Sequence, residues 1–385
     1  MIDPKRFCDI LGRQGVKFYT GVPDSLLNDF CLYLERTFSS DQHIITANEG
    51  NAIALAAGYH VATGTIPFVY MQNSGIGNAV NPLVSLTYKK VYAIPMILLI
   101  GWRGAPEVSD WAHHKKQGEL TPTLLDDLEI PYRIVDNDQV DIEDLSSWAT
   151  KTARELSSPV AIVARKGVFA LSEKFDFNQL VQKYSLSRED AIGIIVDTLP
   201  NSTLYVATTG RATRELFEIR NQRGEGHEHD FLNVGAMGHA SSIATGLAIA
   251  QKNRLVVCLD GDASAIMHMG SMATIGAIKR SNLLHVVLNN GVHESVGGQT
   301  SAGYAINMTM LAESLGYKTV KKPIETKDEL VFKLENLANE LDGPYFIDLR
   351  IRKGIRSDMP LLKTNLISSK NEMMNSLLVT PQVIK

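Results

Sequence analysis

The stretch "RLVVCLDGDAS", residues 254–264, is an apolar run rich in valine and leucine that ends in an acidic turn at Asp262. A short run of this composition, bounded by a turn, is typical of a buried β-strand. A second run, "LLHVVLNN" at 283–290, ends in an amide at Asn290, 28 positions after Asp262. Buried runs of this kind are typical of parallel strands, whose carboxyl ends meet at one edge of a sheet. An acid and an amide at that edge supply the hard oxygen ligands that Mg²⁺ prefers.

Similar apolar runs alternate with amphipathic segments along the whole chain. In the first half they lie at 17–22, 43–47, 67–73, 95–102, 132–136 and 159–165, and in the second at 203–209, 231–235, 254–261, 283–290 and 344–351. Helix-like patterns between them include 121–130 and 143–158. This alternation predicts an α/β protein with two doubly wound domains, each built on a mainly parallel sheet with helices on both faces.

The predicted domains are residues 1–171 and 189–361, joined by a polar, charged linker at 172–188 and followed by a weakly patterned tail at 362–385. Two segments dense in alanine and glycine, 48–64 and 235–251, occupy similar places in the two halves. They indicate two similar units that pack through these helices, within a chain or between chains. Tight contacts between each helix and its own sheet explain the small residues equally well.

The composition and net charge of the chain argue against several classes of protein. The chain has 385 residues, 44% of them hydrophobic, with a formal net charge of −4 and a pI of about 6.2. Nothing in this balance points to nucleic acid or to an anionic membrane surface. The longest apolar run, 91–102, is too short for a transmembrane helix. Three scattered cysteines without metal-finger spacing fit a reducing compartment, so we expect a soluble cytoplasmic protein.

The segment Gly261-Asp262-Ala263, followed by Asn289-Asn290, resembles the cofactor signature of thiamine-diphosphate-dependent enzymes. The resemblance implies that Asp262 and Asn290 bind Mg²⁺ through their side chains and Val292 through its carbonyl. It also implies that Gly261, Ala263 and Ser264 form the turn that holds the diphosphate. Alone, an acidic turn after a strand is an ordinary structural feature.

Two further motifs strengthen the resemblance. In "GAMGHASS", Gly235 and Gly238 flank Met237, which matches the apolar residue that supports the bent cofactor in this class. In "NEGNAIALAAGY", Glu49 matches the carboxylate that activates the cofactor's pyrimidine ring. Core packing for Met237, and a helix-dipole contact next to an Asn48 cap for Glu49, are the alternative explanations.

Over residues 1–360 the chain resembles the phosphonopyruvate decarboxylase family, and somewhat less specifically the sulfopyruvate decarboxylases. The motifs that carry this resemblance are "GVPDSLL" (21–27), "QNSGIGNAVNPL" (72–83), "GWRGAP" (101–106) and "NNGVHESVGGQ" (289–299). It implies decarboxylation of 3-phosphonopyruvate to phosphonoacetaldehyde and CO₂ in phosphonate biosynthesis, with thiamine diphosphate and Mg²⁺. It also implies a pyrimidine-binding first domain, a diphosphate-binding second domain and a homo-oligomer with active sites at the subunit interface.

The stretch "GWRGAPEVSDWAHHKKQGE", 101–119, is predicted to be a glycine-bounded loop that supplies cations for the phosphonate. Its glycines and length suggest that the loop from Gly104 to Gly118 closes over the substrate as a lid. Arg103 and Lys116 are its candidate substrate-binding residues. His114, which keeps the family spacing to "KQG", is a candidate catalytic residue. A solvated charged loop is the alternative.

Three more residues belong to the candidate site by resemblance. Asp24 is expected to face the reacting carbon and relay a proton, although a Pro-Asp-Ser sequence is also common turn chemistry. Asn73 is assigned to the cofactor and Ser74 to the substrate. His113, His293 and Glu294 receive no role.

Competing functions remain at this point. Sulfopyruvate decarboxylation uses the same chemistry on a sulfonate. Carboligation, as in acetolactate synthases, is disfavoured because those enzymes usually keep a middle domain. A non-catalytic binding module is disfavoured by the intact Glu49, Asp262 and Asn290, and a Rossmann dehydrogenase by the lack of a GxGxxG turn after the first strand.

Overall fold

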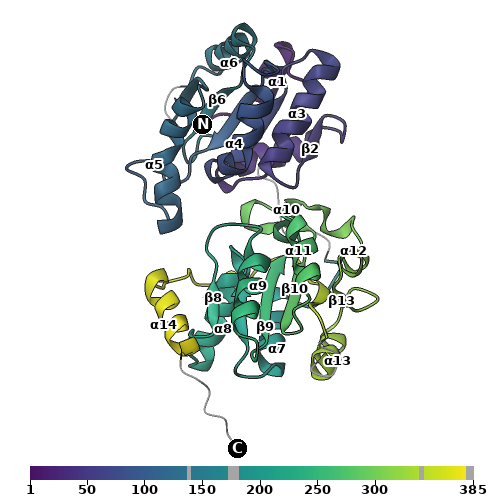
Figure 1. Ribbon diagram of the computed structural model, residues 1–385. Coiled ribbons are helices and arrows are strands. Elements are labelled where there is room, and N and C mark those ends of the chain that lie inside the picture. The colour runs from purple at the N-terminus through teal and green to yellow at the C-terminus, as the bar shows by residue number, and fades with distance from the viewer. Residues whose placement is uncertain (137–139, 172–181, 338–341, 379–385) are drawn as a thin grey trace, which may run out of the picture. The chain divides into compact units, whose positions relative to one another are not determined.

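The structure is a computed structural model that describes residues 1–136, 140–171, 182–337 and 342–378. The chain divides into two compact units. Unit 1 comprises Met1–Phe177 and His293–Gln299, and unit 2 comprises Asn178–Val292 and Thr300–Lys385. Each unit is described by itself below (Figure 1).

Unit 1 is a six-stranded parallel sheet in the order β2-β1-β3-β4-β6-β5. Its strands are β1 (Tyr19–Gly21), β2 (His43–Ile45), β3 (Phe68–Gln72), β4 (Ile97–Gly101), β5 (Tyr132–Val135) and β6 (Val160–Ala164). Buried side chains that alternate along the strands pack against α1 (Pro4–Arg13), α2 (Asn28–Thr37) and α6 (Ile142–Leu156) on one face. The other face packs against α3 (Glu49–Thr63), α4 (Ile76–Pro82) and α5 (Ala112–Asp127).

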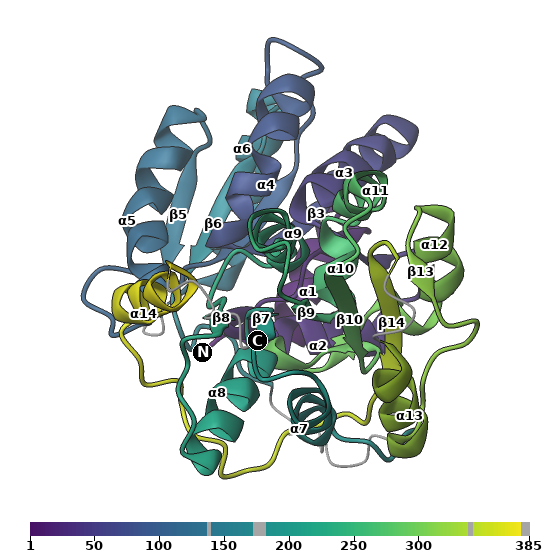
Figure 2. The same cartoon turned by 60° about the horizontal axis from the view of Figure 1, so that its bottom comes forward.

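Unit 2 is a second six-stranded parallel sheet, in the order β13-β14-β10-β9-β7-β8. Its strands are β7 (Leu204–Ala207), β8 (Asp230–Leu232), β9 (Val256–Gly261), β10 (Leu283–Asn289), β13 (Lys318–Thr319) and β14 (Tyr345–Arg350). Figure 2 shows α7 (Arg188–Thr198), α8 (Arg211–Arg223) and α13 (Lys327–Leu337) along one face. The other face carries α9 (Ala240–Ala250), α10 (Asp262–Met267), α11 (Gly270–Ile278) and α12 (Met308–Ser314).

The two sheets have the same topology. Numbered by their order along the chain within each unit, and leaving aside the short β11 (Val292–His293) and β12 (Gln299–Thr300), both read 2-1-3-4-6-5. In this order the chain reverses its direction of travel across the sheet between the first and third strands. Open α/β sheets bind ligands at such a switch point, at the carboxyl ends of the strands. The prediction of two similar α/β units is confirmed, and each unit has its own switch point.

The alanine-rich helices pack on their own sheets. Ala52 and Ala56 of α3, and Ala244 and Ala248 of α9, are fully buried within their units. Small side chains allow this close approach of helix to sheet, so the ordinary helix-on-sheet explanation accounts for these alanines.

Every predicted strand is present, but some details differ from expectation. The two-residue strands β11, β12 and β13 were missed because two residues carry no periodic signal. The expected loop 104–118 is wrong from Ala112 onward, where α5 begins; Gly118 lies inside this helix, where a Cβ would come 1.7 Å from the carbonyl oxygen of Gly104. Its glycine thus permits close packing rather than movement.

The expected tail at 362–385 contains α14 (Leu366–Leu378), which buries Met373. Much of the predicted linker, 172–181, lies outside the described residues, and α7 begins at Arg188. The predicted domain limits therefore stay predictions. Within the described part of the chain, no helix has both the length and the apolar character that crossing a bilayer requires.

Candidate functional site

The switch point of unit 1 is built around Asp24, which follows β1. Its carboxylate is fully buried and accepts hydrogen bonds from Gln72 Nε2 (2.7 Å) and from the Leu26 amide (3.3 Å). A Cβ on Gly101 would lie 1.9 Å from Asp24 Oδ2, so only glycine fits at that end of β4. Burial raises the pKa of Asp24 to about 6, while the hydrogen bond from Gln72 and the charge of Arg103 act in the opposite direction. Such a carboxyl group can hold or release a proton near neutral pH.

Asp24→Asn is expected to alter stability in a pH-dependent way. The folded-state pKa of about 6 is above the ordinary value of 3.8, so wild-type protein loses stability as the pH rises from about 4 through about 6. The neutral amide avoids this loss. We expect the variant to exceed wild type by about 1 to 3 kcal/mol in urea unfolding at pH 8, and to match it at pH 4. An equal difference at both pH values would contradict this account, and exposed Asp41→Asn serves as the control.

Glu49 lies in a second buried pocket of unit 1, at the first turn of α3. Its side chain is 5% exposed, and Asn78 Nδ2 donates to its Oε2 at 2.7 Å. A Cβ on Gly75 would come within 2.3 Å of Glu49 Oε1, so this glycine makes room for the carboxyl group. Burial raises the pKa of Glu49, against the hydrogen bond from Asn78. Asn48 caps the helix by accepting from the Asn51 amide, as the helix-dipole alternative expected.

Arg103, after β4, belongs to a cluster centred on Asp110. The guanidinium donates from Nε to Asp110 Oδ2 at 2.8 Å and from Nη2 to Oδ1 at 2.5 Å. Its Nη1 donates to Ser25 Oγ at 2.9 Å. The same carboxylate lies 2.9 Å from His114 Nδ1. Asp110 therefore brings Arg103 and His114 together, and it occupies the Nε–Nη2 edge of the guanidinium.

The other three predicted residues of this region have different environments. Asn73 is buried and donates to the Arg103 carbonyl and to Thr121 Oγ1, both at 2.9 Å, so its amide supports the loop after β4. Ser74 Oγ donates to Gln72 Oε1 at 2.8 Å and extends the Asp24 network. Lys116 pairs with Glu119 at 3.1 Å with its side chain 74% exposed, apart from the Arg103 cluster.

In unit 2, Asp262 follows β9, the third strand of that sheet along the chain. It is 2% exposed, and Ser301 Oγ makes a very short hydrogen bond to its Oδ2. A Cβ on Gly303 would lie 2.3 Å from Asp262 Oδ2 and 2.7 Å from Asn289 Oδ1, so the loop after β12 covers both oxygens only because it carries glycine. Burial raises the pKa of Asp262 to about 6, because no basic side chain among the described residues pairs with it.

Asn290 follows β10, the strand beside β9. The register pairs Leu288 with Gly261, so the chain ends that carry Asn290 and Asp262 are adjacent at the same edge. Asn290 is buried, and its Oδ1 accepts from the amide of Val292 at 3.1 Å. A positive φ of 71° at Gly291 produces the turn between them. The structure thus brings carboxylate and amide oxygens, with the main chain at Val292, to one edge of unit 2.

The glycine-flanked segment before α9 meets the same edge. Ser264 Oγ accepts from the Gly238 amide at 3.1 Å and lies 2.9 Å from Thr208 Oγ1 at the end of β7. Gly238 has a φ of +84°, and a Cβ there would come 2.5 Å from the His268 ring. The other predicted cofactor-binding residues lie in these same turns: Gly235 and Met237 before α9, and Gly261 and Ala263 at the start of α10.

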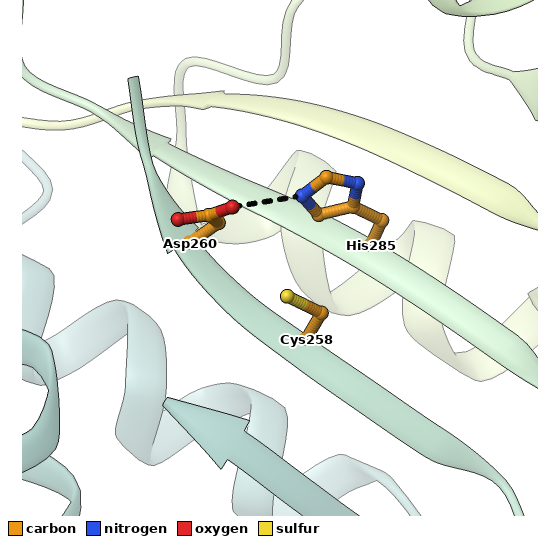
Figure 3. A group of neighbouring side chains, drawn as sticks. All are labelled: Cys258, Asp260 and His285. Carbon is orange, nitrogen blue, oxygen red and sulfur yellow. Dashed lines mark hydrogen bonds and ion pairs between the residues drawn. The ribbon is translucent and has the colours of Figure 1, made fainter. Parts of the chain in front are cut away.

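A group with metal-ligating side chains lies on β9 and β10, just before the Asp262 turn (Figure 3). Cys258, Asp260 and His285 are buried, and their potential ligand atoms all lie within 4.8 Å of one another. Asp260 Oδ2 is 3.4 Å from His285 Nε2, while its Oδ1 accepts from the Gly261 amide at 2.9 Å. The donor types suit zinc rather than Mg²⁺. The contacts show Asp260 bracing the turn that presents Asp262.

Comparison with known proteins fits this geometry. Residues 5–130 match the family "Thiamine pyrophosphate enzyme, N-terminal TPP binding domain", and residues 208–349 match its C-terminal TPP binding domain. A phosphonopyruvate decarboxylase of Streptomyces viridochromogenes is 32% identical, over 88% of this chain and 86% of that protein. The chain belongs to the phosphonopyruvate decarboxylase family of thiamine diphosphate enzymes.

Two further relatives span the family. A phosphonopyruvate decarboxylase of Streptomyces hygroscopicus is 31% identical, over 88% of this chain and 85% of its own. A sulfopyruvate decarboxylase of Methanosarcina acetivorans is 25% identical, over 86% of this chain and 87% of its own. Phosphonopyruvate and sulfopyruvate decarboxylases thus both match nearly the whole chain, and the predicted family and fold are confirmed.

The residues of unit 2 fit the cofactor of this family. Three buried polar atoms of unit 2 have no hydrogen-bond partner among the described residues: Asn233 Nδ2 after β8, His268 Nε2 after α10 and Asn289 Oδ1 at the end of β10. Buried polar groups normally find partners, so these atoms are expected where a polar ligand completes the site. The uncompensated Asp262 carboxylate likewise suits a divalent cation.

Sequence reasoning assigned no role to five residues that contact the candidate site residues in the structure: Gln72, Asp110, Asn289, Ser301 and Gly303. Only Asp110 carried a usable signal, an acid four positions before His114 and therefore on the same side of a helix start. The contacts of Ser301 and Gly303 with Asp262 join segments about 40 positions apart.

Proposed function

We propose that this protein decarboxylates 3-phosphonopyruvate to phosphonoacetaldehyde and CO₂ with thiamine diphosphate and Mg²⁺, as a step in phosphonate biosynthesis. The observation that carries the proposal is the 32% identity to a phosphonopyruvate decarboxylase along 88% of this chain. The two half-sites support it, because each has a buried carboxylate of the type this cofactor requires. When bound, thiamine diphosphate supplies the electron sink for the electrons left by departing CO₂.

The residues of the chain have separate tasks in this proposal. Asp262, Asn290 and the Val292 carbonyl would hold Mg²⁺. Glu49 would hydrogen-bond the pyrimidine ring, where burial strengthens the interaction.

Asp24 and His114 would hold or move protons near the substrate. Arg103 would attract its anionic groups through the guanidinium donors that Asp110 leaves available. Ser74 is retained as a substrate contact through its link to Asp24.

The assembly is also part of the proposal. We infer a homo-oligomer in which unit 1 of one subunit and unit 2 of another complete each active site. The support is that each unit carries only half of the required residues. Light scattering of the purified protein, alone and with cofactor, measures the subunit number. We place the protein in the cytoplasm, because its three cysteines are unpaired and buried.

The direct test incubates purified protein with phosphonopyruvate, thiamine diphosphate and Mg²⁺ and follows the aldehyde by coupled reduction. Aldehyde formation that depends on both cofactors is expected. A parallel arm with sulfopyruvate tests the second candidate function, which the 25% identical Methanosarcina relative favours. A higher kcat/KM for sulfopyruvate would assign that activity instead.

Charge distinguishes the two substrates further. The phosphonate gains its second charge near neutral pH, whereas the sulfonate keeps one. The KM for phosphonopyruvate is therefore expected to change with pH in that range. If thiamine diphosphate does not bind with Mg²⁺ in calorimetry, the chain is a non-catalytic member of the fold.

A further inference from the structure

The Arg103 cluster contains a carboxylate that no family motif named above assigns. We propose that Asp110 is a positioning residue that fixes the tautomer of His114 and the orientation of Arg103 in the substrate pocket. This inference rests on the proposed function for its catalytic consequence. All the contacts that support it lie within unit 1.

Both carboxylate oxygens of Asp110 accept hydrogen bonds from several donors. Besides Arg103 Nε and Nη2, the Gly104 amide donates to its Oδ2 at 2.9 Å and the Trp111 amide to its Oδ1 at 2.8 Å. Its side chain is 10% exposed. Burial alone would raise the pKa of Asp110, but hydrogen bonds from Arg103 and His114 outweigh it and hold the pKa well below its usual range. Asp110 is therefore an ionised acceptor throughout the working pH range.

An ionised carboxylate decides which nitrogen of His114 carries the proton. Since Asp110 Oδ1 only accepts, Nδ1 of His114 at 2.9 Å must be the donor. Burial lowers the pKa of His114, so the ring is neutral near pH 7 and Nε2 carries a lone pair. Among the described residues, no protein group hydrogen-bonds to His114 Nε2. The ring is thus set to accept a hydrogen bond or a proton at Nε2, and Asp110 would stabilise the resulting cation.

The surrounding backbone holds this geometry rigidly. Gly104 has a φ of +66°, and a Cβ there would lie 2.0 Å from the His114 carbonyl oxygen. Trp102 Nε1 donates to the Gly118 carbonyl at 2.9 Å, which ties the end of β4 to α5. The loop after β4 thus lies against the first turns of α5, with Asp110 between them. Pre-organisation of this kind is what a positioning residue provides.

Asp110 also sets the charge of the pocket. Arg103 and Asp110 together carry no net charge, and both histidines of this turn are neutral, since burial lowers the pKa of His113 to about 4. The anionic substrate would meet oriented donors rather than a concentrated positive charge. Recognition of the substrate would then depend more on the orientation of these donors than on the net positive charge around them.

A double-mutant cycle separates positioning from general support of the fold. Asp110→Asn is expected to lower kcat about 10- to 100-fold. In a His114→Ala background the same change is expected to lower kcat by less than about threefold, because the effect of Asp110 on kcat acts through His114, whereas its effect through Arg103 should remain as a higher KM for the substrate. Asp126→Asn, an exposed change on α5, the helix that carries His114, is the matched control.

The tautomer is measured independently of activity. In protein labelled with ¹⁵N-histidine, the ring nitrogens of His114, assigned by their loss in His114→Ala, should show a protonated Nδ1 and an unprotonated Nε2. A protonated Nε2, equal losses of kcat from Asp110→Asn in both backgrounds, or an unchanged kcat for His114→Ala would each overturn the proposal. Absence of decarboxylation by wild type would defeat the proposed function but leave the tautomer result valid for Asp110.

Discussion

Asp262→Asn is expected to abolish Mg²⁺-dependent binding of thiamine diphosphate and to lower kcat/KM at least about 100-fold. The amide has nearly the same shape as the carboxylate but lacks its charge, and a metal-bound diphosphate depends on several kcal/mol of such interaction. The carboxylate is buried with no basic partner among the described residues, so its charge is unbalanced until a cation binds. Calorimetric titration of cofactor, with and without Mg²⁺, measures the effect.

The stability of the cofactor-free variant separates this loss from simple misfolding. Burying an amide costs less free energy than burying an unpaired carboxylate, so cofactor-free Asp262→Asn should unfold at the wild-type urea concentration or above it. Asp328→Asn, an exposed change in the same unit, should bind cofactor normally. Metal-dependent binding that survives in Asp262→Asn would remove this residue from the proposed metal site.

The strand ends explain why candidate site residues could be proposed from the sequence. Apolar runs identify parallel strands, and parallel strands place their following residues at one edge, so Asp262 and Asn290 were proposed from their positions after two strands, whereas Asp24 was assigned by resemblance. The repeated βα patterning also indicated two similar α/β units. Very short strands cannot be predicted in this way, because a strand of two residues, such as β13, shows no hydrophobic periodicity.

Contacts between distant segments could not be predicted in the same way. The glycines of 101–119 were interpreted as loop flexibility, yet Gly104 and Gly118 are glycine because backbone atoms approach each other there. Arg103 was expected to face substrate freely, but Asp110 occupies one edge of its guanidinium. A side chain's partner depends on tertiary packing, which a linear pattern does not encode.

Glu49→Gln is expected to separate cofactor binding from cofactor activation. The amide keeps the size of the side chain, and its oxygen can still accept from Asn78, so the pocket formed by Gly75 should stay filled. It cannot supply the negative charge that favours protonation of the pyrimidine ring. We expect kcat to fall about 100- to 10,000-fold, the range for losing proton-transfer catalysis, with cofactor affinity changed less than about tenfold.

A large loss of kcat with little loss of cofactor affinity would show that Glu49→Gln impairs activation of the cofactor rather than folding of the protein. Single-turnover rates and calorimetry on the same preparation measure them together, with exposed Glu155→Gln of α6 as the control. A cofactor affinity that falls in parallel with kcat would mean that Glu49 mainly holds the ring in place. A kcat within threefold of wild type would show that its burial and raised pKa serve the fold of α3 alone.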